Sequence, residues 1–550
     1  MKSWLRTDTP WIWLNAAAVS ISLLLVLGLL LLIAIQGLGH FWPKTVAEMT
    51  YRDEQDQVRM ILGEIAGTNQ HGGLIAGSAD AGNETEGQGA FQYLIKSGNR
   101  EVNGYDFHWV PANKIERWHY PDQATVIERK EWGNYYGFIE SINEQGRVIA
   151  TNLDAWPVLW AKLDETSIRV TKIQQIEKEV ISKISLQLEQ SVLRKQRLLM
   201  ENTTRTDELS LLEAEITGLE HQYQRYQDEL DQLYPLIKRY SLVARDVDEQ
   251  RQIIPLADIV RIYQPNRLSG SDKIGIYGAR FTEFITGEPR EANSEGGIFP
   301  ALFGTVMMVI VMSIVVAPLG VVAAIYLQEY AKQGFVTQLI RISVHNLAGV
   351  PSVVFGVFGL GFFVTVLGGE MDRLFYPQAY PVPVFATPGL LWASLTMAML
   401  TLPVVIVSTE EGLLRVPRSI REGSLALGAT QAETLWRTVL PLVSPAMLTG
   451  LILAVARAAG EVAPLMLVGV VKLAPALPVD SSFPFVHLER KFMHLGFHIY
   501  DVGFQSAHIE AARPLVYATA LLLVIVIISL NLTAVCIRNY LRKKYQAMEE

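Results

Sequence analysis

Cysteine is almost absent from this chain of 550 residues, whose one cysteine, Cys536, lies inside an apolar run. A single cysteine excludes a disulfide framework and a cysteine-based metal cluster. Charge is also scarce: 19% of residues are charged and the net charge is -8, so no basic face for nucleic acid is indicated. The chain lacks the pattern G-x-x-x-x-G-K-[ST], which excludes ATP binding through a P-loop.

Long apolar runs dominate instead, since half of all residues are hydrophobic. A helix needs about 20 apolar residues to cross a membrane core of roughly 30 Å. The first run continues beyond the length of a cleavable signal peptide, which predicts an uncleaved anchor within residues 1–36. The predicted spans are residues 14–35, 300–327, 347–367, 389–407, 442–471 and 514–537.

Lysine and arginine predict how these spans are oriented. Lys2 and Arg6 precede the first span and favour a cytoplasmic amino terminus. With that start, the basic segments 328–341, 408–440 and 538–550 all fall in the cytoplasm. The pattern predicts a multi-pass protein whose two termini are cytoplasmic.

The region between the first and second spans is predicted to lie on the far side of the membrane, and its first part, residues 37–167, to be rich in β-structure. Short alternating stretches such as 58–67 and 135–142 are bounded by turn-forming residues, as strands are. Residues 72–89 are rich in Gly, Ala, Asn and Ser and predict a loop. No catalytic constellation stands out there.

Residues 168–240 predict an antiparallel coiled-coil hairpin. Apolar residues recur with three-four spacing from Leu209 to Tyr240, and a looser stripe precedes a turn near 201–208. Residues 241–299 are predicted as a segment returning to the second span. The predicted fold class is therefore an α-helical membrane protein with six spans and a far-side α+β insertion.

A polar stretch, EGSLALGATQAETLWRTVLP from Glu422, separates two of the apolar runs. It predicts a short helix to Leu427, a turn at Gly428 and a second helix from Gln431. An ordinary amphipathic connection would have the same pattern of polar and apolar residues. Arg415, Arg418 and Arg421 nearby fit either electrostatic steering of a partner or solvated charges on the inner side.

Two charges lie inside the predicted span 442–471. Arg457 and Glu461 are four residues apart, on one helical face near the middle of that span. A charge left in lipid costs about 2.5 to 3.5 kcal/mol on insertion scales, so both should face the bundle interior. They either line the path of an anion or form an ion pair that only supports the fold.

Histidines gather in the last far-side loop. A zinc site is conceivable, but no cysteine accompanies them, and structural histidines are favoured, so no metal site is predicted. The four histidines are His487, His494, His498 and His508.

The polar stretch resembles the EAA loop of ABC importer permeases, whose pattern is E-A-A, three residues, G, nine residues, I-x-L-P. Gly and Ser replace the two alanines, and Thr438 replaces the isoleucine. In that family the loop, here near 410–441, forms a coupling helix that docks into a cytoplasmic ATPase. The resemblance implies an ATPase-coupling role for Glu422, Gly423, Ser424, Gly428, Leu440 and Pro441.

The segments NLAGVPSVVFGVFGLG, ALGAT and RAAGEVAPLM resemble the A-type (PstA) permeases of phosphate importers, in a permease core of residues 300–550. This resemblance implies a bacterial inner-membrane protein whose far-side insertion is periplasmic and belongs to an extended form of the family. It implies three partners: a second permease of PstC type, an ATPase dimer of PstB type that holds ATP and Mg, and a PstS-type phosphate-binding protein. The chain itself would bind no cofactor and catalyse no covalent step.

On that resemblance, Arg457 and Glu461 serve the passage of inorganic phosphate. Two other functions stay open from the residues alone. One is an importer of another oxyanion, such as sulfate or molybdate, with the same machinery. The other is a membrane-anchored periplasmic scaffold or sensor built on the coiled coil, which would need neither a docking hairpin nor charges in a span.

Overall fold

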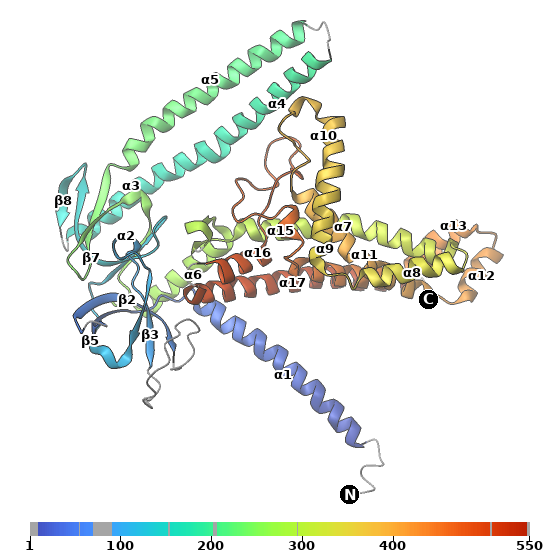
Figure 1. Ribbon diagram of the computed structural model, residues 1–550, viewed down its shortest axis with the longest axis horizontal. Coiled ribbons are helices and arrows are strands. Elements are labelled where there is room, and N and C mark those ends of the chain that lie inside the picture. The colour runs from blue at the N-terminus through green and yellow to red at the C-terminus, as the bar shows by residue number, and fades with distance from the viewer. Residues whose placement is uncertain are drawn as a thin grey trace, which may run out of the picture. The chain divides into compact units, whose positions relative to one another are not determined.

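The computed structural model describes residues 9–53, 56–69, 91–151, 154–201, 206–293, 295–506 and 509–546. The chain divides into two compact units (Figure 1). The helical unit consists of Met1–His40, Ile285–Pro289 and Ile298–Glu550. The α+β unit consists of Phe41–Phe284 and Arg290–Gly297.

The helical unit contains the long apolar helices. Among the described residues, 6 helices are long and apolar enough to cross a membrane, and the predicted six-span helical membrane fold is confirmed. The apolar stretches are Trp11–Gly39, Phe299–Tyr330, Ser352–Phe375, Leu390–Arg415, Gln431–Gly460 and Ala512–Tyr540.

These stretches are built from several helical elements. They are α1 (Thr9–Gly39), α7 (Phe299–Ile325) with η7 (Tyr326–Tyr330), α9 (Ser352–Phe358) with η8 (Gly359–Gly368) and α10 (Gly369–Phe375), α11 (Leu390–Arg415), α13 (Gln431–Thr434) with η10 (Leu435–Val439) and α14 (Leu440–Gly460), and α17 (Ile509–Gln546). Shorter helices join them: α8 (Phe335–Leu347), α12 (Arg418–Ala426), α15 (Leu465–Val468), α16 (Leu495–Tyr500) and η11 (Asp501–Gln505).

Helix α11 is the most buried of the apolar helices and forms the centre of this unit. Small residues let its neighbours approach closely. A Cβ on Gly320 of α7 would lie 2.6 Å from Val405 Cγ1, and one on Gly450 of α14 would lie 2.6 Å from Ser408 Cβ. Glycine at such crossings allows the backbone contact that holds membrane helices together.

Two predicted spans have different bounds in the structure. The span predicted at 347–367 begins only at Ser352, because Pro351 precedes the helix rather than lying inside it. The span predicted at 442–471 ends at Gly460. Pro464 explains that end, since a proline ring clashes with the carbonyl four residues before it in a continuous helix.

The α+β unit contains two antiparallel sheets with the same strand order. The first is β4-β3-β2-β1-β5 and the second β10-β9-β7-β6-β11, with β8 paired to β7. The strands are β1 (Val46–Arg52), β2 (Val58–Asn69), β3 (Gln92–Lys96), β4 (Phe107–Pro111), β5 (Ile115–His119), β6 (Thr125–Arg129), β7 (Tyr135–Glu144), β8 (Arg147–Thr151), β9 (Tyr240–Arg245), β10 (Arg251–Pro255) and β11 (Ile259–Tyr263).

The two sheets share a further detail. In each, the fourth and fifth strands are joined by a single 3₁₀ turn that follows a proline: η2 (Ala112–Lys114) after Pro111, and η5 (Leu256–Asp258) after Pro255. Counted without β8, both sheets therefore follow one topology. The unit is a duplication of one five-stranded motif. The unit also holds α2 (Arg100–Asn103), α6 (Gly270–Thr286) and η6 (Glu291–Asn293), and a small ladder pairs β12 (Pro289–Arg290) with β13 (Glu295–Gly296).

A long helical hairpin is inserted between the second and third strands of the second copy. Its first arm runs through α3 (Ala155–Gln175), η4 (Ile176–Ile181) and α4 (Ser182–Met200), and its second arm is α5 (Thr206–Ile237) (Figure 1). Ion pairs such as Lys172 Nζ to Glu229 Oε1 (2.7 Å) and Lys195 Nζ to Glu213 Oε1 (2.8 Å) show that the arms run antiparallel. The finer prediction, a coiled coil, stays a prediction.

Several details of the predicted insertion differ from the structure. The first arm begins at Ala155, inside the part expected to be β-rich, and the returning segment carries β9, β10 and β11 rather than a simple connection. β9 pairs with β7 and β11 pairs with β6, both distant in sequence, and β10 pairs with β9. Local patterns did not indicate these three strands. The loop predicted at 72–89 and half of the turn near 201–208 lie outside the described residues.

Candidate functional site: a coupling-type hairpin and a charged helix end

The hairpin that follows α11 owes its shape to two local hydrogen-bond patterns. At the end of α12, Gly428 has φ 89°, its N–H donates to the Leu425 carbonyl (3.0 Å), and the Ala429 N–H donates to the Ser424 carbonyl (3.3 Å). This pair of bonds is the Schellman motif, which favours glycine at the left-handed position. The predicted turn at Gly428 is therefore present.

The second helix of the hairpin begins with a capping box. Thr430 Oγ1 accepts from the Glu433 N–H (3.2 Å), and the Glu433 carboxylate accepts from the Thr430 N–H (2.9 Å). Both bonds satisfy N–H groups that a helix start leaves free. Across the hairpin, Ser424 Oγ lies 2.9 Å from Thr434 Oγ1. The hairpin is thus held by its own contacts.

The hairpin exposes both acidic and apolar side chains. Glu422 is exposed and forms no hydrogen bond or ion pair within the part of the chain that the structure describes. Leu427 is 91% exposed and Trp436 69% exposed. Large apolar side chains in such positions mark surfaces that contact another molecule.

The buried side chains of the hairpin pack against the membrane-spanning helices. Leu435, Val439 and Leu440 are buried in one apolar cluster with Ile325 of α7 and Leu413 of α11. Pro441 is half-buried and follows the wide π-type turn of η10, which is consistent with its missing N–H. Of the residues that match the EAA pattern, Glu422, Gly423 and Gly428 are exposed. Leu440 is buried in the cluster that attaches the hairpin to α7 and α11.

Arg421 has neither of the roles expected for it. Its guanidinium turns inward: Nη2 donates to the Leu413 carbonyl (2.7 Å) and lies 2.9 Å from Glu329 Oε1. Arg418, one turn earlier on α12, is exposed. Sequence reasoning missed the Arg421 contacts because Glu329 lies on another helix, far away in sequence.

Arg457 and Glu461 lie at a helix end, not in the middle of a span as predicted. Arg457 is in the last turn of α14, and Glu461 is the first residue after it, with an extended backbone. Arg457 Nε is 3.5 Å from Glu461 Oε1, and the two side chains are 35% and 23% exposed. A cation in the last turn is favoured by the helix dipole. The two side chains therefore form an ion pair, and both remain partly exposed.

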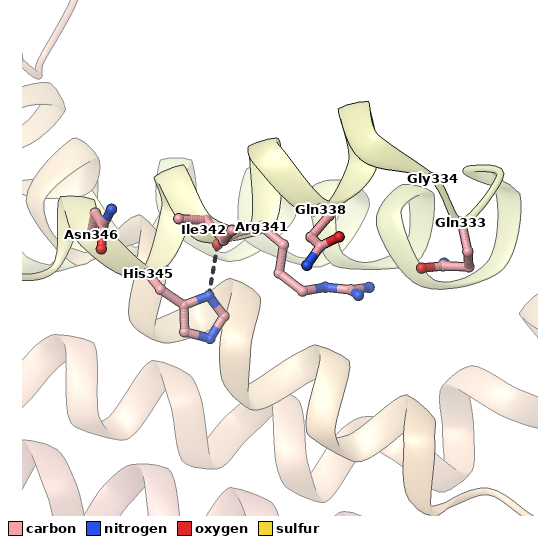
Figure 2. Close-up of a pocket in the computed structure, with 7 residues that line it drawn as sticks. All are labelled: Gln333, Gly334, Gln338, Arg341, Ile342, His345 and Asn346. Atoms are coloured by element: carbon pink, nitrogen blue, oxygen red, sulfur yellow. Dashed lines mark hydrogen bonds between the residues drawn. The ribbon is translucent and has the colours of Figure 1, made fainter.

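An open pocket of about 730 Å³ lies along α8 and contains none of the predicted site residues. Figure 2 shows Gln338, Arg341 and His345 along one face of this helix. The Nδ1–H of His345 donates to the Arg341 carbonyl (2.7 Å), and Arg341 Nε lies 3.4 Å from Glu410 Oε1 of α11. The apolar side chains of Phe335 and Val336 on α8 are highly exposed, which indicates that this helix lies at the surface.

The histidines of the last loop have structural contacts. His494 Nδ1 caps α16 by accepting from the Gly496 N–H (3.1 Å), and burial lowers the pKa of this histidine to about 3. His487 lies between the carboxylates of Asp480 (3.1 Å) and Glu489 (3.0 Å). The ring of His498 lies 3.5 Å from Thr519 Oγ1. His508 lies outside the described residues.

Comparison with known proteins concerns the part of the chain that contains these features. Residues 316–546 match the family described as binding-protein-dependent transport system inner membrane component. A protein of Mycobacterium tuberculosis named phosphate transport system permease protein PstA 1 is 33% identical over 244 residues, which cover 44% of this chain and 71% of that protein. The PstA protein of Yersinia pestis is 28% identical over 261 residues, covering 47% and 78%.

Among solved structures, the MetNI methionine ABC transporter in an inward-facing conformation matches 44% of this chain and 96% of its own, with 15% identity and a TM-score of 0.31. The sequence relatives carry the assignment. They are transporter permease subunits and not enzymes. The chain therefore belongs to the family of PstA-type permeases, the membrane subunits of ABC importers.

Proposed function

We propose that this chain is a pore-forming permease subunit of an ATP-driven importer of inorganic phosphate. The hairpin of α12 and α13 would dock into a cytoplasmic ATPase of PstB type, which binds ATP and Mg. A second permease of PstC type would complete the pore, and a PstS-type protein would deliver phosphate. No cofactor is assigned to this chain.

The proposed coupling role rests on the contrast between the exposed and the buried side chains of the hairpin. Glu422 and Leu427 are exposed, while Leu435 and Leu440 are buried against α7 and α11. A partner bound to the exposed side chains would therefore move a rigid element that is fastened to the spans. Gly423, Ser424, Gly428 and Pro441 would shape that element.

Phosphate as the substrate is supported by the names of the relatives and by Arg457. An arginine fork can bind two phosphate oxygens at once. Glu461, 3.5 Å away, would hold Arg457 when no anion is present. Another oxyanion would suit the same arginine, so anion competition decides this point. Family membership favours a permease over an anchored scaffold or sensor.

The proposed location is the bacterial inner membrane, with both termini in the cytoplasm and residues 37–299 in the periplasm. The positive segments 328–341, 408–440 and 538–550 support this orientation. It places the hairpin on the side where ATP is available.

The coupling role is tested by co-purification with the ATPase. Glu422→Lys reverses an exposed charge of the hairpin without touching a buried contact, so we expect weaker ATPase capture with unchanged folding. Glu370→Lys is the control, because Glu370 is also exposed but lies in a different apolar stretch, Ser352–Phe375, where its partner is Arg373 (3.0 Å). ATPase capture at wild-type strength by the Glu422 variant would contradict the docking role.

The substrate role is tested by uptake in proteoliposomes that contain the co-expressed complex. Arg457→Gln removes a charge-assisted contact worth about 1.5 to 3 kcal/mol, so phosphate uptake should fall on the order of tenfold or more while assembly persists. Normal uptake would leave Arg457 as a structural partner of Glu461. Sulfate and molybdate as competitors test whether phosphate is the preferred anion.

A further inference from the structure

Two ion pairs join the segment from the end of α7 through α8 to the segment from the end of α11 through α12. Glu329, in η7 at the end of α7, lies 2.9 Å from Arg421 of α12. Arg341, on α8, lies 3.4 Å from Glu410 near the end of α11. Each pair therefore has one member after α7 or on α8 and the other on α11 or α12. We refer to Glu329, Arg341, Glu410 and Arg421 as the polar clasp.

The clasp is partly shielded from water. The side chains of Glu329 and Arg421 are 16% and 24% exposed, and that of Glu410 is 8% exposed. Surface ion pairs contribute little, but a partly buried pair whose partner is removed leaves a charge without compensation. Removing one member of either pair would therefore leave a partly buried charge without its partner.

Arg421 connects three elements at once. From α12 it reaches Glu329 after α7, and its Nη2 also donates to the Leu413 carbonyl in the last turns of α11. The last carbonyls of a helix lack partners within the helix, and an arginine can satisfy one of them. The flat guanidinium can serve a carboxylate and a carbonyl together, which a lysine ammonium does less well.

The clasp joins helices that do not follow one another directly in the chain. The hairpin continues directly from α11 and into α14, so both helices must follow its movement. Helix α7 has no such connection to the hairpin. Its neighbouring apolar contacts, such as Ile325 with Leu413, are non-directional and permit sliding. An ion pair with defined partners resists that sliding.

We propose that the polar clasp passes the movement of the coupling hairpin to α7 and α8, with Arg421 and Glu329 as positioning residues for transport. This inference rests on the proposed function and assigns a role to residues outside the EAA-like motif. Without the clasp, the ATPase would still bind and hydrolyse ATP, but only apolar contacts would link α7 to the hairpin, and α7 would follow its movement less closely.

The test compares ATP hydrolysis with phosphate uptake in proteoliposomes of the complete complex. Arg421→Gln and Glu329→Gln should keep ATPase capture and hydrolysis within about twofold, while uptake falls on the order of tenfold. Arg418→Gln is the matched control, since Arg418 is exposed on the same helix.

Two results would overturn the proposal: unchanged uptake in both single variants, or uptake and hydrolysis falling in proportion. If a variant fails to assemble, Arg341→Gln and Glu410→Gln test the other pair in the same assay. Absence of phosphate uptake in the wild-type complex would count against the proposed function, which keeps the two failures distinguishable.

A second readout needs neither ATPase nor transport. In a Cys536→Ser background, spin labels at Lys332→Cys and Ser419→Cys report the distance between the two segments in the purified chain; both positions are exposed. The distance distribution should be narrow in this background and broader when Arg421→Gln is added. An unchanged distribution would show that Arg421 does not hold the junction together.

Discussion

At the scale of single residues, Gly428 illustrates how a sequence motif becomes geometry. Its φ of 89° lies in the left-handed region, where side chains other than glycine are strained. A Cβ there would meet no atom within 4 Å, so backbone conformation alone requires the glycine. Gly423, in the same motif, lies inside α12 and has no such requirement.

Substituting each glycine by alanine should therefore have opposite effects. Gly428→Ala should destabilise the hairpin by about 1 to 2 kcal/mol through left-handed strain. Gly423→Ala should stabilise α12 by about 0.5 to 1 kcal/mol, because alanine loses less entropy in a helix. Thermal unfolding of the detergent-purified chain measures both. Equal effects of the two substitutions would contradict the assigned turn geometry.

At the scale of elements, the short helix α16 depends on a neutral histidine. His494 Nδ1 accepts a hydrogen bond from the Gly496 N–H, which requires that nitrogen to be unprotonated. Burial lowers the pKa of His494 to about 3, from an ordinary value of 6.5. Protonation would put a charge in a buried position and remove the cap.

The stability of the helical unit should therefore fall as the pH drops below 6.5. Between pH 6.5 and 3 the unfolded chain binds a proton at this histidine that the folded chain does not, so each pH unit costs about 1.4 kcal/mol. Thermal unfolding midpoints at pH 7, 6 and 5 measure this loss. His494→Asn, which can cap but cannot titrate, should show a flatter dependence; an identical slope would refute the assignment.

At the scale of the whole molecule, the α+β unit is two copies of one motif with a helical hairpin inserted in the second. The buried residues Ala155 and Leu159 join the base of the hairpin to the second sheet, and Tyr240 begins the strand after it. The outer parts of the two arms pair with each other through contacts such as Lys195 with Glu213. The outer hairpin is therefore separable from the sheets.

Replacing residues 184–222 by a short Gly-Ser linker should leave the sheets folded and the complex assembled. The deletion spares Leu159, Tyr240 and the lower cluster of Ile173, Ile176 and Leu230. Removing 164–240 instead should unfold the second sheet, because it takes away Tyr240 of β9. Limited proteolysis and co-purification distinguish the two variants. Loss of assembly with the shorter deletion would show that the complex needs the outer hairpin.

Part of this duplication was visible in the sequence. VPANKIERW from Val110 and IPLADIVRI from Ile254 share a proline, a three-residue turn and an alternating strand. Local patterns had indicated strands at 58–67 and 135–142 but not β9 to β11. Of these short segments, β9 and β11 pair with the distant strands β7 and β6, and β10 depends on β9. The end of α14 was also readable, from Gly460 and Pro464.

The sequence alone determined that there are apolar spans and that the hairpin turns at Gly428, because these depend on the composition and periodicity of neighbouring residues. Only the tertiary structure decided which charges meet. Arg421 faces Glu329 and Arg341 faces Glu410 across long separations in the chain. Such pairs depend on how helices pack, and packing depends on all of the helices together.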